Sequence, residues 1–123
     1  YTSFANMGVE IETNLISSIE KNTNTIYEKK KFSYKTSKPT QAYILTTILQ
    51  DVIKRGTGRR AKVKGIELAG KTGTTNKSVD AWFAGYSPTM ECVVWFGNDD
   101  NTPMFHRETG GRVAAPAFAN YFR

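Results

Sequence analysis

The chain of 123 residues contains no long apolar run, and this absence limits what it can be. Nothing approaches the ~18 consecutive apolar residues of a membrane-spanning helix, so the sequence predicts no transmembrane segment. Residues 1–6 have neither the basic start nor the apolar middle of a signal peptide, and no initiator methionine precedes them. A helix-like pattern begins there without a cap. We therefore expect one domain at most, cut from a longer protein.

Cysteine and histidine occur once each, which excludes several kinds of site. A single cysteine forms neither an internal disulfide framework nor a multi-cysteine metal site. Cys92 lies in an apolar run and is predicted to be a buried hydrophobic residue rather than a nucleophile. His106 lies in a polar loop with no nucleophile elevated on its own turn, so no triad is expected. Acidic residues at metal-ligand spacing are also lacking, and we expect no metal or other cofactor.

Acidic residues are scarce in the middle of the chain, whose net charge is +6. Eleven of the seventeen basic residues fall between Lys29 and Lys64, against Asp51 alone. This distribution is typical of a solvated basic face, and it also suits an anionic partner such as a carboxylate, an acidic polymer or a lipid headgroup. Nucleic acid is disfavoured as a partner because the aromatic residues are not interleaved with the basic ones.

Hydrophobic periodicity predicts helices and antiparallel strands without βαβ alternation, which is an α+β fold. The predicted helices cover residues 1–7, ending at Gly8, then a segment opening at 38–40 and ending at 55–58, and finally 113–122. The predicted strands cover 15–20 and 25–29, joined as a hairpin by 21–24, and then 68–75, 81–87 and 91–97. The last three strands have short connections, which implies antiparallel neighbours. They are apolar on both faces, so we expect helices to cover their sheet.

The sharpest local motif is Gly70-Lys71-Thr72-Gly73-Thr74-Thr75. We do not interpret it as a phosphate-binding P-loop, because the run itself is predicted to be a strand. Alternation places Lys71, Gly73 and Thr75 on one face and Thr72 and Thr74 on the other. Gly73 removes a side chain where a ligand backbone can approach. Such a strand suits an anionic, peptide-like ligand, and it equally suits an ordinary polar edge strand whose lysine prevents aggregation.

Further blocks accompany this motif in a fixed order. They are Arg-Gly-Thr-Gly-Arg at 55–59, Asp-Ala-Trp-Phe-Ala-Gly-Tyr-Ser-Pro at 80–88, Trp-Phe-Gly-Asn-Asp-Asp-Asn at 95–101, Thr-Gly-Gly at 109–111 and Ala-Ala-Pro at 114–116. With residues 1–8 and 70–75, this succession resembles the bifunctional class A penicillin-binding proteins over nearly the whole chain. The implied fold is that of the penicillin-binding-protein and serine β-lactamase domains, an antiparallel sheet covered by helices.

The resemblance implies a serine D,D-transpeptidase, which cross-links peptidoglycan by acyl transfer from D-Ala-D-Ala stem peptides and is a target of β-lactams. By resemblance, Lys71 helps to organise proton transfer around the nucleophile. Thr74 offers its hydroxyl to the ligand carboxylate and its backbone N–H to the oxyanion hole. Thr72 assists carboxylate binding, and Gly73 and Thr75 complete the substrate-binding strand. A cation and hydrogen-bond donors preset where negative charge develops are the largest contribution to catalysis of acyl transfer.

The chain departs from the family pattern at the nucleophile. Its only Ser-x-x-Lys, Ser18 to Lys21, falls in the predicted hairpin rather than at a buried helix start, and no Ser-x-Asn occurs. We therefore expect residues 1–123 to be the C-terminal portion of a single transpeptidase domain. The nucleophilic serine, a glycosyltransferase domain and a membrane anchor are then expected on a preceding part of the protein. This chain alone is expected to be inactive.

Two other functions fit the same residues. A non-catalytic β-lactam-sensing or peptidoglycan-binding module would keep the groove without acylation, and a Ser-x-x-Lys in the upstream sequence would distinguish it from a transpeptidase. A β-lactamase is disfavoured by the long flanking blocks, and turnover of a β-lactam would revive it. The partners implied are the upstream part of the domain, stem peptides and β-lactams, on the periplasmic side of the bacterial inner membrane.

Overall fold

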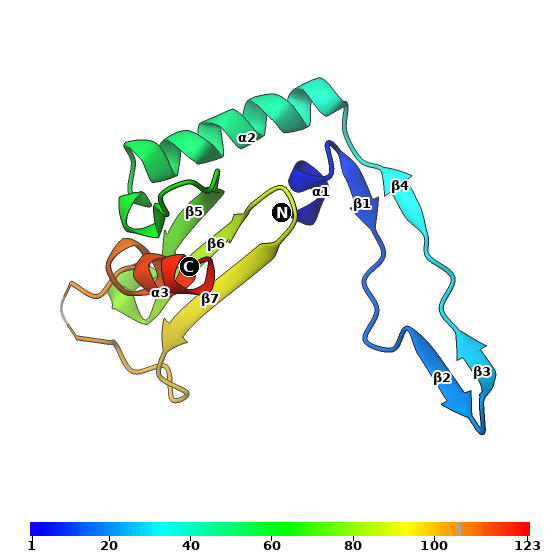
Figure 1. The fold of residues 1–123 in the computed structure, drawn as a ribbon. Helices are drawn as coiled ribbons and strands as arrows, with labels where there is room; N and C mark the ends of the chain where they lie inside the picture. Colours follow the sequence, from blue (N-terminus) through cyan, green and yellow to red (C-terminus); the bar gives the residue numbers. More distant parts are fainter. Residues whose placement is uncertain (106) are drawn as a thin grey trace.

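The computed structural model describes residues 1–105 and 107–123, in which helices and short strands alternate (Figure 1). The helices are α1 (Thr2–Ala5), α2 (Pro39–Lys54) and α3 (Ala115–Tyr121), with single-turn segments η1 (Arg59–Ala61), η2 (Asn76–Ser78) and η3 (Gly110–Ala114). The strands are β1 (Val9–Ile11), β2 (Ser18–Lys21), β3 (Asn24–Glu28), β4 (Ser33–Lys35), β5 (Ala69–Thr74), β6 (Asp80–Tyr86) and β7 (Glu91–Gly97). Within these residues, no helix combines the length and apolar character needed to span a membrane. His106 and its predicted loop position lie outside the described residues.

The first four strands form an arm that extends away from the rest of the chain (Figure 1). β1 pairs with β4 and β2 with β3, both antiparallel. The turn between β2 and β3 is Asn22-Thr23, and both residues have positive φ angles, 49° and 69°, as two-residue hairpin turns require. The predicted hairpin is confirmed. β2 is shorter than the predicted strand over 15–20, β3 lies one residue earlier than the predicted 25–29, and both strands are exposed throughout.

α2 has the start and the apolar spacing that the sequence predicts. Pro39 occupies the first turn, where a missing N–H costs nothing, and the Lys38 N–H donates to Gln41 Oε1 at 3.0 Å. Leu49 and Ile53 are buried, whereas Ile48 is exposed. α1 ends before Gly8, whose φ of 88° is one that only glycine adopts without strain.

The three-stranded sheet has the order β5-β6-β7, and every pairing is antiparallel. The strand predictions for 68–75, 81–87 and 91–97 are therefore confirmed to within a residue or two. In the part of the chain that the structure describes, β5 pairs with β6 alone, which makes β5 an edge strand. Register with β6 decides which side chains share a face, because alternate residues point to opposite sides.

One face of this sheet carries the main core. Phe83 of β6 and Phe118 of α3 are both fully buried, and their ring centroids lie 4.7 Å apart. Phe122 continues the stack at 4.7 Å from Phe118, and Ala114 and Ala115 let the helix approach closely. The predicted C-terminal helix with small residues against the sheet is confirmed, although helical structure begins earlier, at η3.

The opposite face is covered only near one end. There Ala69 and Tyr86 pack against Leu49 of α2 and against α1. Farther along, Trp82 and Trp95 lie side by side with 41% and 43% of their surface exposed. The α+β class and the helix-covered antiparallel sheet are confirmed. Within the described residues, helices do not cover the whole of the second face, because α1 and α2 reach only the end of the sheet that Tyr86 occupies.

Replacing Phe118 by Ala tests which contacts hold the sheet to the C-terminal helix. Phe118 is 0% exposed and lies between two other rings, so Phe118→Ala is expected to lower the free energy of unfolding by about 3–5 kcal/mol. Urea unfolding followed by tryptophan fluorescence measures this loss. Tyr121→Ala is the matched control on the same helix, because Tyr121 is 59% exposed. A loss of similar size in both variants would contradict this account of the core.

Candidate functional site

The predicted motif strand is β5, and its side chains alternate as the sequence indicates. Thr72 and Thr74 lie on the face of the buried Phe83, and Lys71 and Gly73 lie on the opposite face. Lys71 and Thr74 are exposed, and Thr72 is half-buried. The free edge of β5 therefore presents the motif to solvent, and the predicted edge-strand position of Lys71 is confirmed.

The same motif also has the spacing of a phosphate-binding loop, and the structure excludes that interpretation. Gly65 and Gly70 precede Lys71 and Thr72 in the pattern Gly-x-x-x-x-Gly-Lys-Thr. A P-loop needs those residues in a loop that leads into a helix, so that backbone N–H groups surround a phosphate. Here Gly70, Lys71 and Thr72 lie inside a strand paired with β6. The chain therefore uses the motif as a strand edge.

Lys71 reaches around the edge of its own strand. Its ammonium donates to the carbonyl oxygen of Thr72 at 2.8 Å and to the Thr72 hydroxyl at 3.4 Å. Strict alternation would keep these two side chains apart, but the long lysine stem at an unpaired edge has room to curl. A positive charge and a hydroxyl thus lie together at the centre of the strand.

Two further contacts hold the threonine hydroxyls of β5. Thr57, in the loop after α2, lies with its hydroxyl 2.8 Å from that of Thr72. The backbone N–H of Gly110 donates to Thr74 Oγ1 at 3.1 Å. A Cβ on Gly110 would fall within 3.0 Å of the carbonyl oxygen of Gly73, so a larger residue could not approach the strand this closely. Segments far apart in the sequence therefore meet at the threonines.

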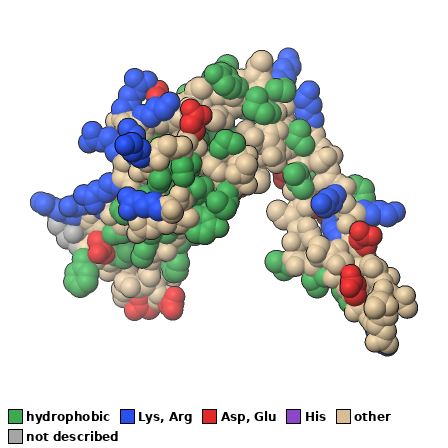
Figure 2. Space-filling view, in the orientation of Figure 1, with side chains coloured by type: hydrophobic (Ala, Val, Ile, Leu, Met, Phe, Trp, Pro, Cys, Tyr) green, Lys and Arg blue, Asp and Glu red, His purple; other side chains and the backbone are tan. Residues whose placement is uncertain are grey.

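These segments enclose a groove of about 470 Å³, called here the basic groove. Its lining consists of Gly56, Thr57, Arg59, Arg60, Thr72, Thr74, Thr109, Gly111 and Arg112. Three arginines and four threonines line it, and none of its described lining residues is acidic. Figure 2 shows Lys and Arg side chains gathered over the end of α2 and the turn that follows. A groove with this lining favours an anionic ligand that accepts hydrogen bonds, such as a carboxylate.

The arginines are held partly by backbone oxygens. Arg60 donates to the carbonyl oxygen of Arg112 at 3.3 Å, and Arg112 donates to that of Arg107 at 3.5 Å. Neutral acceptors leave the guanidinium charges uncompensated, which keeps the groove positive. The sequence predicted a basic surface across residues 29–64. The structure brings two of those arginines together with Arg112, which lies far outside that range.

Thr75 does not join the other motif residues. Its hydroxyl donates to Asp80 Oδ2 at 3.1 Å and accepts from the Asp80 backbone N–H at 2.8 Å. The other carboxylate oxygen of Asp80 accepts from Trp95 Nε1 at 2.8 Å. Thr75 thus closes the turn between β5 and β6 in this structure, and its substrate-binding role stays a prediction.

The remaining candidates from the sequence lie away from the groove. Cys92 is half-buried against the core, and burial raises the pKa of its thiol, which disfavours the nucleophilic thiolate. Ser18 begins the exposed strand β2, so Lys21 is not one helical turn away from it. Among the residues described, no group of His, Cys, Asp or Glu side chains is arranged to hold a metal ion.

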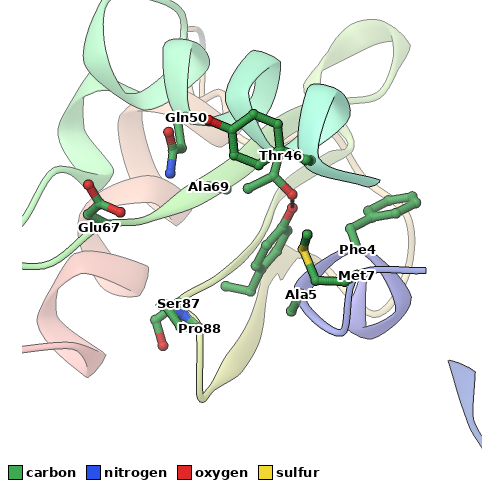
Figure 3. Close-up of a pocket in the computed structure, with 11 residues that line it drawn as sticks. Phe4, Ala5, Met7, Thr46, Gln50, Glu67, Ala69, Ser87 and Pro88 are labelled. Atoms are coloured by element: carbon green, nitrogen blue, oxygen red, sulfur yellow. Dashed lines mark hydrogen bonds between the residues drawn. The ribbon is translucent and has the colours of Figure 1, made fainter. Parts of the chain in front are cut away.

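A smaller cavity of about 210 Å³ lies between α1, α2 and the sheet (Figure 3). The hydroxyls of Thr46 and Tyr86 meet in it at 2.8 Å, and burial raises the pKa of the Tyr86 phenol. Its lining is mostly apolar and includes Phe4, Ala5 and Met7. It lies at the end of the sheet near Tyr86, apart from the basic groove. Nothing in its chemistry points to catalysis.

Sequence reasoning did not assign roles to several residues of the basic groove. Thr57 and Arg59 belong to the block at 55–59, which Arg60 follows, and Gly111 belongs to the block at 109–111, which Arg112 follows. The available signal was the pair of glycine-rich runs that flank the motif strand. Glycines at such places indicate that the backbone approaches another segment closely. Only the fold shows which segment that is.

Comparison with known proteins places this geometry in a family. The model of the penicillin binding protein transpeptidase domain matches residues 1–123. The chain is 56% identical over 81 residues to penicillin-binding protein 1A of Pseudomonas aeruginosa, covering 65% of the chain and 10% of the relative. It is 43% identical over 86 residues to penicillin-binding protein 1A of Neisseria gonorrhoeae, covering 69% and 11%. The chain thus spans about a tenth of the length of these curated relatives.

Solved structures agree on the fold. Penicillin-binding protein 1A from Haemophilus influenzae has a TM-score of 0.83 at 23% identity, covering 98% of this chain and 24% of that one. The D,D-transpeptidase domain of a peptidoglycan glycosyltransferase from Eggerthella lenta has a TM-score of 0.75 at 27% identity, covering 98% and 29%. Penicillin-binding protein A from Mycobacterium tuberculosis, solved as an imipenem acyl-enzyme complex, has a TM-score of 0.74 at 21% identity, covering 98% and 28%. The chain belongs to the penicillin-binding protein transpeptidase domain family.

Proposed function

We propose that this chain forms one wall of a serine D,D-transpeptidase site that cross-links peptidoglycan by acyl transfer from D-Ala-D-Ala stem peptides, and that β-lactams acylate the same site. The observation that carries the proposal is the meeting of Lys71, Thr72 and Thr74 at the free edge of β5, beside a groove lined by three arginines. A stem peptide and a penicillin both end in a carboxylate, which suits such a groove. The imipenem acyl-enzyme of the Mycobacterium tuberculosis relative supports β-lactams as ligands.

Each residue of the motif has a role in this proposal. The Lys71 ammonium helps to organise proton transfer around the nucleophile. The hydroxyls of Thr72 and Thr74 donate to the ligand carboxylate, and Gly73 leaves room for the ligand backbone. The Thr74 backbone N–H faces the oxyanion of the tetrahedral intermediate, where a preset donor lowers the barrier to acyl transfer. Thr75, the residue after β5, is also proposed to bind substrate, although here its hydroxyl is bonded to Asp80.

The nucleophile is proposed to come from another part of the same domain. The chain covers 29% of the Eggerthella lenta transpeptidase domain, and its only Ser-x-x-Lys lies in an exposed hairpin. In the reaction, a serine oxygen bonds to the penultimate D-Ala carbonyl carbon, and the terminal D-Ala leaves with a proton on its amine. Residues 1–123 are proposed as the C-terminal portion of that domain. The complete protein is proposed to work at the periplasmic face of the inner membrane, anchored there and carrying a glycosyltransferase domain.

The missing nucleophile also favours a second candidate function. A groove that binds carboxylates without a serine beside it would serve a non-catalytic β-lactam-sensing or peptidoglycan-binding module. The two candidates share every residue described here and differ in covalent chemistry. Acylation of the complete protein by a labelled penicillin decides between them.

The isolated chain is expected to form no covalent adduct with a labelled penicillin. Its described residues offer charge and hydrogen-bond donors, but no activated serine. Intact-mass measurement of the chain alone, and of the complete transpeptidase domain as the positive control, tests this. Stoichiometric acylation of residues 1–123 by themselves would overturn the division of the site proposed here.

Replacing Lys71 by Ala in the complete protein is expected to slow acylation by about 10²-fold or more, the scale of a positioned proton-transfer or electrostatic group. The second-order acylation rate constant for a labelled penicillin measures it. Because Lys71 is exposed on an edge strand, the melting temperature should change little. Lys64→Ala, in the exposed loop before β5, is the control. If Lys71→Ala reacts at the parent rate, Lys71 only protects the strand edge.

Replacing Thr74 by Val separates its hydroxyl from its backbone. Valine is nearly isosteric and suits a strand, so the N–H stays in place while the hydroxyl is lost. A hydrogen bond to a charged group contributes roughly 1.5–3 kcal/mol, so acylation by penicillins should fall about 10- to 150-fold. The loss should shrink for a penicillin whose carboxylate is esterified. Equal losses for acid and ester would mean a displaced strand, since Thr74 also holds Gly110.

A further inference from the structure

The loop that follows α2 is fixed against the motif strand from two sides. The backbone N–H groups of Gly56 and Gly58 donate to the carbonyl oxygen of Val52 at 3.1 and 3.0 Å, which ties the loop to the end of the helix. From the other side, a Cβ on Gly111 would lie 2.5 Å from the Thr57 carbonyl oxygen, so η3 packs directly on this loop. Thr57 is therefore held in place by backbone contacts that do not involve its own hydroxyl.

Within residues 1–105 and 107–123, the Thr57 hydroxyl makes one hydrogen bond, with the Thr72 hydroxyl at 2.8 Å. A hydroxyl has one proton to donate and two lone pairs to accept. Lys71 only donates, and its ammonium lies 3.4 Å from Thr72 Oγ1, which occupies one of those lone pairs. If Thr57 donates as well, both lone pairs of Thr72 are used. The Thr72 proton then has no partner among the residues that the structure describes and is available to the groove.

The basic groove selects between the two directions that this hydrogen bond can take. Thr72 and Thr57 both line it, together with Arg59, Arg60 and Arg112. Guanidinium groups only donate, so a ligand that satisfies them is an acceptor, such as a carboxylate. A bound acceptor beside Thr72 draws the Thr72 proton toward itself and leaves Thr57 to donate to Thr72. The chain of donors then runs from Thr57 through Thr72 to the ligand.

We propose that Thr57 is a positioning residue, which donates to the Thr72 hydroxyl and thereby presents Thr72 as a donor to the carboxylate of the acyl donor. This rests on the proposed function, because it assumes a carboxylate-bearing ligand in the basic groove. Thr57 itself does not touch the reacting atoms. Thr57 affects carboxylate recognition by Thr72. This effect is lost when either Thr57 or Thr72 lacks its hydroxyl.

The test measures the second-order acylation rate constants of the complete transpeptidase protein with benzylpenicillin and with its methyl ester. Thr57→Val should slow acylation by benzylpenicillin about 3- to 10-fold, the range for one neutral hydrogen bond, and should slow the ester reaction by less than twofold. Thr57→Ser keeps the hydroxyl and should restore the parent rate. Thr57→Ala replaces the valine variant if that one fails to fold. Thr47→Val, whose hydroxyl bonds only to the Ile44 carbonyl oxygen on α2, is the matched control.

A double-mutant cycle with Thr72→Val separates this proposal from the proposed function. If Thr57 acts through Thr72, the double variant reacts no more slowly than Thr72→Val alone. If Thr72→Val slows benzylpenicillin but Thr57→Val does not, the positioning role is wrong and the carboxylate site stands. If Thr72→Val itself leaves the acid and the ester unchanged, the carboxylate role of Thr72 fails, and the role of Thr57 fails with it. Additive losses would also overturn the positioning role.

Discussion

The groove depends on the close approach of Gly110 to the backbone of β5. A side chain on Gly110 would collide with the carbonyl oxygens of Gly73 and Trp82, so η3 could not rest on the strand. That contact delivers the Gly110 N–H to the Thr74 hydroxyl and places Gly111 against the Thr57 carbonyl. Three segments separated by up to about fifty residues then line one groove. The glycine-rich sequence at 109–111 is therefore a packing requirement of the site.

The edge position of β5 explains how the Lys71 ammonium reaches Thr72. On a central strand, a neighbour would occupy the space through which the lysine stem curls toward Thr72. β5 has no neighbour there, so the ammonium reaches both the carbonyl and the hydroxyl of Thr72. A lysine at an exposed edge also discourages pairing with other strands. The same exposed position therefore suits both roles considered for Lys71, preventing pairing with other strands and placing a positive charge beside Thr72.

Local signals made much of the fold predictable, and tertiary contacts account for the rest. α2 and the strands β5, β6 and β7 follow from apolar periodicity and turn residues, which act within a few positions of the sequence. The pairing of Thr57 with Thr72 joins residues fifteen positions apart, and no periodicity encodes it. Thr75 was predicted to lie on the motif strand, but the strand ends at Thr74 and the Thr75 hydroxyl bonds to Asp80 in the turn that follows. The sequence motif shows which side chains are present at the site, whereas their hydrogen-bond partners are known only from the fold.

Binding and catalysis make different demands on these residues. The arginines and the hydroxyls of Thr72 and Thr74 suit a carboxylate that carries its charge before, during and after reaction, so they stabilise ground state and transition state alike. Uniform stabilisation of this kind improves binding without lowering the barrier of the bound complex. The chemical step is accelerated instead by a donor that meets charge formed during the reaction, the role proposed for the Thr74 N–H, and by a group that assists proton transfer, the role proposed for Lys71. A catalytic wall and a binding module can therefore share this groove unchanged, and the difference between them resides in the serine that approaches it.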